Sequence, residues 1–277
     1  MRTLRFKQVD VFTRRPFMGN PVAVVLEAEG LGDEDMQRIA AWTNLSETTF
    51  VLPPGNPAAD YRLRIFTPRA ELPFAGHPTI GSAHAVLEAG LVRPKAGKLH
   101  QECGAGIIDL SVDGETLWLH APPATESAFA EIPLLEKILG AKTKDTPSVI
   151  NVGPRWLVAE MDDAAAVGAL NPDMALLTEL SNRLSIGGVT VYGAASDGQS
   201  AVHLRSFAPA HGIPEDPVCG SGNISVAAYL RERGQLERVG SRYTARQGMQ
   251  LGRDGRVSLR VEDGHIFLGG SAVTCVD

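Results

Sequence analysis

One motif occurs twice in this chain, and the duplication constrains the fold more than any other feature of the sequence. Residues 63–91 and 204–236 each have the pattern of a strand, a polar loop that ends in a glycine-containing turn, and a helix. The matched residues are Leu63, Arg64, Phe66, Pro68, Pro73, Gly76, Ile80, Ala83 and Gly90 in the first copy and Leu204, Arg205, Phe207, Pro209, Pro217, Gly220, Ile224, Ala227 and Gly234 in the second. Two copies predict a duplicated fold with a site where the two turns meet.

Length and composition limit the class of protein. A chain of 277 residues with 44% hydrophobic residues fits one large globular domain or two small ones. The formal net charge of −6 argues against binding to nucleic acid or to an anionic membrane through bulk electrostatics. We expect no membrane span, because no apolar run is long enough, and no signal peptide. The odd number of cysteines, without a CxxC pair, fits reduced thiols in the cytoplasm.

Strand-like segments outnumber helical ones along the chain. They are Val9–Phe12, Pro21–Leu26, Thr48–Leu52, Tyr61–Phe66, Ile107–Val112, Leu117–His120, Val149–Val152, Trp156–Ala159, Val189–Tyr192, Val202–Phe207, Val257–Val261 and Ile266–Val276. These segments do not alternate one-for-one with helices, as they would in a doubly wound fold. The sequence therefore predicts the α+β class.

Four segments have helical patterns. One begins at Asp33, which we expect to cap it, and a counterpart in the second half begins at Asn171. The other two are the repeat helices, residues 78–90 and 222–234, each stopped by a glycine. Their first turns are small or apolar on nearly every side, and such a helix is surrounded by protein. We expect each to be the axis of a barrel-like sheet.

The domain division follows from the same pattern. Residues 121–130 have the composition of a linker and lie near the midpoint of the chain. We expect an N-terminal barrel half over residues 1–121 and a C-terminal half over residues 131–262. Residues 263–277 form a C-terminal strand that can return to the N-terminal half.

The two turns of the repeat, Gly76–Thr79 and Cys219–Asn223, each stand at a helix N-terminus. Free backbone N–H groups and the positive end of the helix dipole make such turns anion sites. A single turn of this kind is more simply a tight connection between strand and helix. Two matched turns favour a site that holds a small carboxylate.

Several residues near these turns are candidates for chemistry. His77 and Ser221 occupy matched positions, and histidine transfers protons near neutral pH. Asp216 directly precedes the second turn, where it can orient an ammonium group or remain a solvated loop acid. Glu47 lies between a helix and an apolar strand, a junction at which burial raises the pKa of a carboxyl. Nucleotide-loop, zinc-protease and hydrolase motifs are absent, and the spacing of His and Cys indicates no metal site.

These segments together resemble the PhzF family of phenazine-biosynthesis isomerases, which have the diaminopimelate epimerase-like fold. The resemblance runs nearly end to end and is carried by VDVF and PFMGNPVAVVL, NLSETTFV, RIFTPRAELPFAGHPTIGSAH and EDPVCGSGN. It implies two similar halves, each a β-barrel around a central helix, with the active site in the cleft between them. It also implies a homodimer and no cofactor.

The resemblance implies roles for individual residues. Glu47 is similar to the family's proton-transferring carboxylate, and His77 and Asp216 to its partners in substrate binding and proton handling. Ser221 resembles the hydroxyl at the second turn. The implied substrate cradle consists of Asn20, Gly76, Gly220 and Gly222.

Cys219 departs from the threonine common at its position in the family. Epimerases and racemases of this fold use two opposed cysteines, one at each turn, but the matching position in the first turn is Ala75. Two-thiol racemisation is therefore excluded. We interpret Cys219 as a small buried residue at the substrate-binding turn, with an active thiol as the alternative.

The leading hypothesis is an isomerase of a small amino- or hydroxy-acid-like substrate. Glu47 would move a proton between two carbons of one π-system, while helix N-termini stabilise the charge on the carboxylate. Two alternatives stay open: a lyase or single-thiol epimerase that uses Cys219 with Glu47 or His77, and a non-catalytic metabolite-binding protein. The intact set of Glu47, His77, Asp216 and Ser221 speaks against the binding protein.

Overall fold

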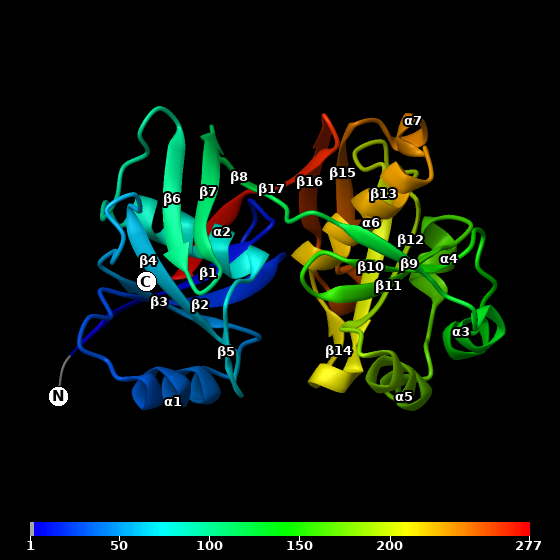
Figure 1. Ribbon diagram of the computed structural model, residues 1–277, viewed down its shortest axis with the longest axis horizontal. Helices are drawn as coiled ribbons and strands as arrows, with labels where there is room; N and C mark the ends of the chain where they lie inside the picture. The colour runs from blue at the N-terminus through cyan, green and yellow to red at the C-terminus, as the bar shows by residue number, and fades with distance from the viewer. Residues whose placement is uncertain (1–2) are drawn as a thin grey trace. The chain divides into compact units, whose positions relative to one another are not determined.

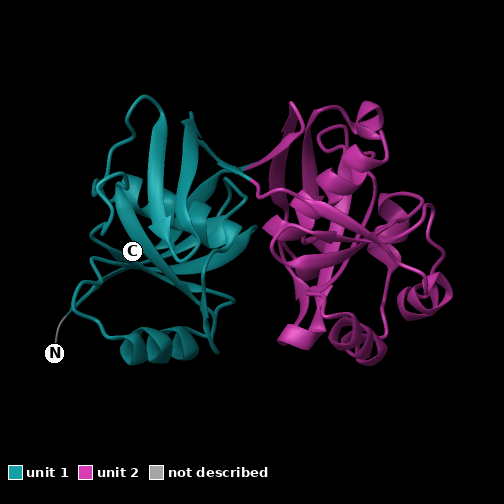
Figure 2. Cartoon of the chain, viewed as in Figure 1, with its two compact units in different colours: residues 1–120, 269–277 teal, residues 121–268 magenta. Residues whose placement is uncertain are grey.

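The computed structural model describes residues 3–277 (Figure 1). The chain divides into two compact units (Figure 2). The described part of unit 1 covers residues 3–120 and 269–277, and unit 2 covers residues 121–268. The last nine residues thus belong with the N-terminal part of the chain, and this segment begins at Gly269.

Unit 1 is a twisted sheet around one buried helix. Its strands are β1 (Arg5–Val11), β2 (Asn20–Leu26), β3 (Thr48–Leu52), β4 (Tyr61–Phe66), β5 (Glu71–Leu72), β6 (Lys98–Cys103), β7 (Gly106–Asp113), β8 (Thr116–His120) and β18 (Ala272–Val276). The pairing order is β18–β1–β2–β3–β4–β6–β7–β8, antiparallel except for β2–β3 and β4–β6. Helix α1 (Asp33–Thr43) packs outside on β3 and β4, whereas α2 (Gly76–Glu88) contacts β1, β2, β3, β4, β8 and β18.

Unit 2 repeats this arrangement. Its strands are β9 (Thr125–Ala128), β10 (Ser148–Asn151), β11 (Arg155–Glu160), β12 (Gly188–Ala194), β13 (Val202–Ala208), β14 (Ile213–Asp216), β15 (Arg242–Gln247), β16 (Gly255–Glu262) and β17 (His265–Gly270), the last of which ends in unit 1. Its helices are α3 (Ile132–Leu139), α4 (Ala164–Ala169), α5 (Met174–Leu184), α6 (Gly220–Glu232) and α7 (Leu236–Val239), with 3₁₀ turns at Pro209–His211 and Met249–Leu251. The order β9–β10–β11–β12–β13–β15–β16 has parallel pairs at β11–β12 and β13–β15, the positions that are parallel in unit 1.

The central helices α2 and α6 explain the lack of a polar face in the repeated motif. Nine of the 13 residues of α2 and ten of the 13 residues of α6 are buried. A helix that is covered on nearly all sides has no solvent face to place charged residues on. The predicted fold, two similar halves with a barrel-like sheet around a central helix in each, is confirmed.

The structure corrects the predicted starts of two helices. Gly32, not Asp33, is the N-cap of α1, and no side chain caps it. The Asp33 carboxylate instead accepts a hydrogen bond from Arg64 at 2.6 Å. Helix α5 starts at Met174 rather than Asn171, because the carboxylate of Asp173 accepts the N–H groups of the first turn.

Two further predictions, one of a linker and one of a strand, differ from the structure. The expected linker, residues 121–130, contains β9, which pairs with β10 along its whole length. All four side chains of β9 are exposed, so the segment lacks the alternation that marks a half-buried strand. The expected single strand Ile266–Val276 is two strands, β17 and β18, separated at Ser271.

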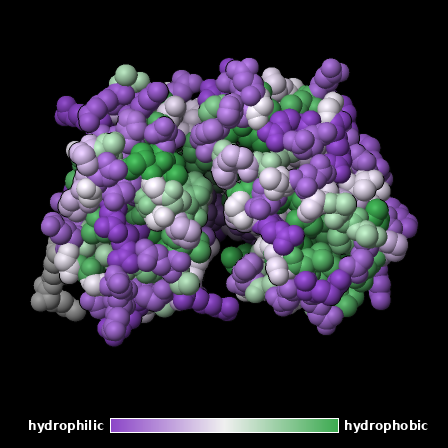
Figure 3. Space-filling view, in the orientation of Figure 1, coloured by the Kyte–Doolittle hydropathy of each residue, from purple (hydrophilic) through white to green (hydrophobic). Residues whose placement is uncertain are grey.

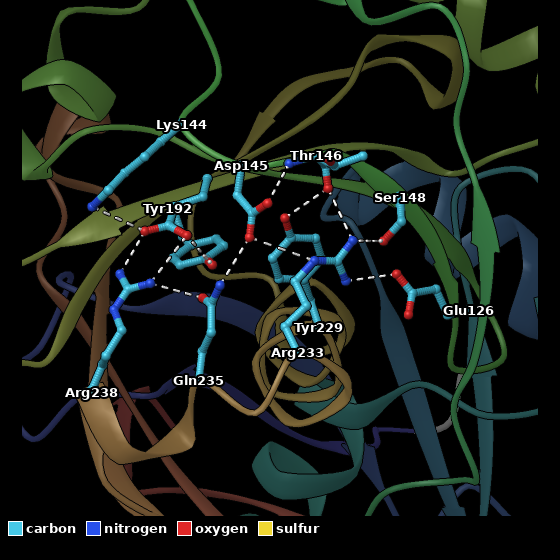
Figure 4. Close-up of polar contacts among 11 residues, drawn as sticks. Glu126, Lys144, Asp145, Thr146, Ser148, Tyr192, Tyr229, Arg233, Gln235 and Arg238 are labelled. Carbon is cyan, nitrogen blue, oxygen red and sulfur yellow. Dashed lines mark hydrogen bonds and ion pairs between the residues drawn. The ribbon is translucent and has the colours of Figure 1, made fainter.

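The C-terminal end of α6 is held by a cluster of charged and aromatic side chains (Figure 4). The guanidinium of Arg233 stacks 3.6 Å from the ring centroid of Tyr229. It donates hydrogen bonds to the Thr146 carbonyl at 3.0 Å and to the Glu126 carboxylate at 2.6 Å. These contacts join α6 to the segment around β9 and β10, and so fix the helix whose other end carries the second turn.

The surface is polar over most of the face in Figure 3, with small hydrophobic patches on each unit. Every helix within residues 3–277 is too short or too polar to span a membrane.

Candidate active site

The first turn brings a buried carboxyl and a histidine together in unit 1. Glu47 directly precedes β3, and His77 is the second residue of α2. Oε2 of Glu47 lies 3.4 Å from Nε2 of His77, and the two side chains are only 15% and 8% exposed. The two residues singled out from separate motifs of the sequence are therefore neighbours.

Local structure explains this proximity. Helix α1 ends at Thr43, and its C-cap Asn44, with the left-handed φ of 55°, turns the chain back toward the sheet. The carbonyl of Glu47 accepts a hydrogen bond from Ala23 of β2, which continues the parallel β2–β3 ladder. The hydroxyls of Thr49 and Ser82 hydrogen bond at 2.8 Å and attach β3 to α2. Glu47 is thereby held beside the first turn of α2.

Burial gives Glu47 the electrostatics of a proton-transfer group. Loss of solvent raises the pKa of the Glu47 carboxyl to about 7, while a hydrogen bond from Ser46 opposes this shift. Its Oε2 is buried and accepts no hydrogen bond from the residues that the structure describes. A carboxyl with a pKa near neutrality can accept and return a proton in the same cycle.

Two of the residues predicted to form the substrate cradle, Asn20 and Gly76, lie in unit 1 at the start of β2 and of α2. Asn20 is the first residue of β2 and is 1% exposed. The preceding Gly19 donates its N–H to the buried Asp10 carboxylate at 2.9 Å. A side-chain carbon on Gly19 would lie 2.0 Å from the Val11 carbonyl oxygen, so only glycine fits there. Gly76 is the first residue of α2.

The second turn, in unit 2, is capped by a thiol. Cys219 is the N-cap of α6 and its Sγ accepts the Gly222 N–H at 3.3 Å. The side chain is buried, at 4% exposure, and the Ser221 Oγ lies 3.6 Å from Sγ. Burial, together with the negative charge of Asp216, raises the pKa of the Cys219 thiol far above its usual range. The thiol is therefore protonated near neutral pH and serves the helix as a cap.

Gln247 of β15 holds the second turn in place, a role that no sequence motif indicates. This fully buried side chain accepts the Cys219 N–H at 3.1 Å and donates to the Asp216 carbonyl at 2.9 Å. Asp216 in turn accepts the Val218 N–H at 3.0 Å through its carboxylate. Strand β15 lies outside the predicted strands, so its contact with the turn was missed.

Gly222 is required by packing within unit 2. A side-chain carbon at this position would lie 2.6 Å from the Ser206 Oγ and 2.8 Å from the Thr190 Oγ1. Those two hydroxyls hydrogen bond each other across β12 and β13. Close approach of α6 to the sheet accounts for this glycine without a ligand, whereas Gly220 begins the helix itself.

Trp156 of β11 is a second residue that sequence reasoning missed. Its side chain is buried, and its indole Nε1 donates a hydrogen bond to the Ser221 Oγ at 2.9 Å. Ser221 itself is only partly buried. No motif marks Trp156, because the contact joins residues 65 positions apart in the chain.

A repeated ion pair explains two of the matched residues in the duplicated motif. Arg64 binds Glu71 at 2.7 Å in unit 1, and Arg205 binds Glu215 at 2.8 Å in unit 2. Each pair closes the short hairpin that leads into its turn, β4–β5 or β13–β14. In unit 2 this hairpin also carries Asp216, the residue after Glu215.

The predicted site residues thus form one group in each unit. Unit 1 holds Asn20, Glu47, Gly76 and His77, and unit 2 holds Asp216, Cys219, Gly220, Ser221 and Gly222. Within residues 3–277, no group of His, Cys, Asp and Glu side chains is arranged to hold a metal ion. That the two turns share one cleft stays a prediction.

The chain is similar in sequence to known proteins over nearly its whole length. The family model described as phenazine biosynthesis-like protein, PhzC-PhzF, matches residues 9–277. A Pseudomonas aeruginosa trans-2,3-dihydro-3-hydroxyanthranilate isomerase is 35% identical, over 93% of this chain and 90% of the relative. Antisense-enhancing sequence 1 of Schizosaccharomyces pombe is 42% identical, over 98% of this chain and 96% of the relative.

Solved structures agree with the sequence relationship. The Bacillus anthracis phenazine biosynthesis protein of the PhzF family superposes with a TM-score of 0.88 at 27% identity, covering 99% of this chain and 97% of that one. A probable proline racemase from Agrobacterium radiobacter has a TM-score of 0.69 at 16% identity, covering 99% of this chain and 92% of that one. The second likeness shows the common fold alone.

Proposed function

Because this chain belongs to the phenazine biosynthesis-like family, whose relatives include named isomerases, we propose that it moves a proton on a small carboxylate-bearing substrate by cofactor-free acid–base catalysis. The observation that carries the proposal is the buried Glu47 carboxyl, 3.4 Å from His77, with its pKa raised to about 7. A group that is half ionised near neutrality serves as base and as acid.

The proposed reaction is a 1,3 proton shift. The Glu47 carboxylate takes a proton from one carbon of the substrate, which leaves an electron pair delocalised over the adjacent π-system. The resulting carboxylic acid returns the proton to the carbon at the other end of that system, so the product is an isomer and Glu47 is ionised again. The buried position of Glu47 limits contact of the reacting atoms with bulk water.

The second turn supplies the proposed anion-binding groups. The first N–H groups of a helix lack intrahelical partners and attract negative charge. The Ser221 hydroxyl stands beside them in the first turn of α6. Donors in these positions would bind the substrate carboxylate and stabilise the charge that develops during proton transfer. Asp216 would hold an amine, which suits an amino- or hydroxy-acid-like substrate.

The test compares Glu47→Gln with wild type. We expect turnover of trans-2,3-dihydro-3-hydroxyanthranilate, or solvent deuterium incorporation into candidate amino and hydroxy acids, to fall by about 100-fold or more. The exposed Glu34→Gln variant on α1 (side chain 85% exposed) is the matched control and should keep full activity. Full turnover by a folded Glu47→Gln protein would remove the basis of the proposal.

The deuterium experiment separates an enzyme from a binding protein, whereas the state of the Cys219 thiol bears on the choice between the enzymes. A lyase or single-thiol epimerase would need the Cys219 thiolate, which the raised pKa of that thiol disfavours. A non-catalytic metabolite-binding protein would incorporate no deuterium into any substrate.

Two further parts of the proposal rest on the family and on thiol chemistry. We propose a homodimer, for which light scattering after gel filtration should give twice the chain mass of 29.5 kDa. We propose a cytoplasmic location, which the three free cysteines support.

A further inference from the structure

Strand register makes positions in the two units equivalent. Phe66 and Phe207 match in the duplicated motif. Phe66 pairs with Thr48 across β3 and β4, and Phe207 pairs with Val189 across β12 and β13. The residue that precedes Thr48 in unit 1 therefore corresponds to the residue that precedes Val189 in unit 2.

These equivalent positions are filled differently. In unit 1 the position is Glu47, whose carboxyl lies 3.4 Å from His77. In unit 2 it is Gly188, which has no side chain. Trp156 pairs with Gly188 on the adjacent parallel strand, and its indole reaches Ser221, the counterpart of His77, at 2.9 Å. Thus a side chain beside or within the sheet lies close to the second residue of each central helix: Glu47, just before β3, in unit 1 and Trp156, in β11, in unit 2.

The chemistry of the indole fixes the role of the serine hydroxyl. Indole Nε1–H is a donor only, so the Ser221 Oγ must accept from Trp156. The hydroxyl proton then points to another acceptor. Among residues 3–277, its other side-chain partner is the Cys219 Sγ at 3.6 Å, and sulfur is a weak acceptor. The Ser221 hydroxyl can therefore donate its proton to a stronger acceptor than the Cys219 sulfur.

Burial restricts where the Trp156 indole can point. The residue is 5% exposed, and its Nε1 is directed at the Ser221 Oγ at 2.9 Å. Ser221 is partly exposed, whereas the next nine residues of α6, 222–230, are all buried. A buried donor behind a partly exposed hydroxyl orients that hydroxyl outward.

We propose that Trp156 is a positioning residue: its indole directs the Ser221 hydroxyl to donate a hydrogen bond to an anionic oxygen of the substrate. This inference rests on the proposed function, and it identifies the Ser221 proton as the donor and Trp156 as the residue that selects this orientation. Trp156 itself contacts no reacting atom in this scheme.

The first experiment tests the contact without any ligand. In ¹⁵N-labelled protein, loss of one indole signal in Trp156→Phe assigns the Trp156 Nε1–H resonance. We expect this resonance to move upfield in Ser221→Ala, because its acceptor is gone. A resonance that does not move would overturn the inference. Ser221→Ala removes one oxygen from a partly exposed residue, so this arm does not depend on folding of the tryptophan variant.

The second experiment tests the role, with anthranilate as a stable ring carboxylate. We expect Trp156→Phe to weaken binding about 3- to 10-fold, the scale of one hydrogen bond. The Trp156→Phe/Ser221→Ala double variant should bind as Ser221→Ala does, because Trp156 acts through Ser221. Trp42→Phe, at an 86% exposed residue of α1, is the control and should bind as wild type.

Additive losses in the double variant would mean that Trp156 acts by packing, and would overturn the positioning role. Failure of the wild type to bind anthranilate would instead show that the proposed substrate class is wrong. The indole resonance still decides the Trp156–Ser221 contact in that case, so the two failures are distinguishable.

Discussion

Burial has opposite chemical consequences for Glu47 and Cys219. Glu47 is buried beside the first turn of α2 and Cys219 is buried at the N-cap of α6, and burial raises the pKa of both. For the carboxyl, the shift ends at about 7, where both protonation states are populated at neutral pH. For the thiol, the shift moves the pKa further from neutrality and suppresses the nucleophilic form. The same physical cause therefore prepares Glu47 for proton transfer and makes Cys219 inert.

The raised pKa of Glu47 predicts a pH-dependent stability. The folded protein keeps the Glu47 proton up to a pH of about 7, whereas the unfolded chain releases it near 4.5. Folding thus takes up a proton in this window, so the contribution of Glu47 falls with rising pH by about 1.4 kcal/mol per unit. Glu47→Gln removes the titration. Its stability relative to wild type should rise between pH 4.5 and 7 and then level off.

Urea unfolding of both proteins at half-unit pH steps measures this difference. Glu34→Gln, whose side chain is 85% exposed, is again the control and should follow the wild type. A stability difference between wild type and Glu47→Gln that is constant over this range would show that the folded carboxyl titrates at its ordinary pKa.

The capping role of Cys219 predicts that its thiol is dispensable. In Cys219→Ser a hydroxyl replaces Sγ as acceptor of the Gly222 N–H, and serine is a preferred N-cap residue. We expect turnover within about 3-fold of wild type and helix stability changed by less than about 1 kcal/mol. A large loss of turnover, or stoichiometric inactivation by a thiol reagent with protection by substrate, would favour thiol catalysis.

At the residue scale, the sequence predicted as candidates the residues that lie in a recognisable motif, and their catalytic roles stay predictions. Glu47 and His77 were singled out separately, one from its junction and one from its turn, and they are in contact. Trp156 and Gln247 were missed because each meets the second turn through strand register, which no local pattern encodes. Only the pairing of β11 with β12 and of β13 with β15 brings these side chains to α6.

At the element scale, the predicted helices succeeded where burial is extreme. The repeat helices α2 and α6 were recognised because an apolar surface on all sides leaves one structural solution. Strands β9 and β14 were missed because neither has a buried residue, so their sequences show no hydrophobic alternation. Such strands form because a neighbouring edge satisfies their backbone groups.

A buried ammonium group fastens the last strand to unit 1. Lys7 of β1 is 4% exposed in its side chain and binds Glu88 of α2 at 2.9 Å and Asp277, just after β18, at 2.7 Å. Because a buried charge without partners is costly, Glu88→Gln/Asp277→Asn should destabilise unit 1 by roughly 2–4 kcal/mol. Lys7→Met removes the charge together with the need for partners, so it should cost much less.

Urea midpoints and hydrogen exchange of the β1 and β18 amides measure both effects. The exposed pair of Arg38 and Glu34 provides the control, since Glu34→Gln should cost less than about 1 kcal/mol. Lys7→Met could instead destabilise unit 1 as much as the double variant does. In that case β18 is held by the electrostatic attraction between Lys7 and its two carboxylates, and not by the need to pair a buried charge.

At the scale of the whole molecule, the two units repeat one backbone arrangement but have different side chains at their turns. Each unit has two parallel strand pairs, an Arg–Glu ion pair on the hairpin before its turn, and a buried central helix. The residues at the equivalent positions near the turns differ between the units. Unit 1 has Glu47 and His77 where unit 2 has Gly188 and Ser221. In the proposed function, one unit therefore carries the proton-transferring pair, and the other carries hydroxyl and backbone donors suited to an anion.

This division of roles predicts that one ligand per chain depends on residues of both units. In the proposed function neither group is sufficient alone, because proton transfer would need the base of unit 1 and charge stabilisation would need the donors of unit 2. Isothermal titration with anthranilate should give a stoichiometry of one per chain, weakened about 10-fold by either His77→Ala or Ser221→Ala. The exposed Trp42→Phe variant of α1 should bind normally. Two independent sites, each abolished by only one of the two substitutions, would contradict a shared site and the catalytic roles built on it.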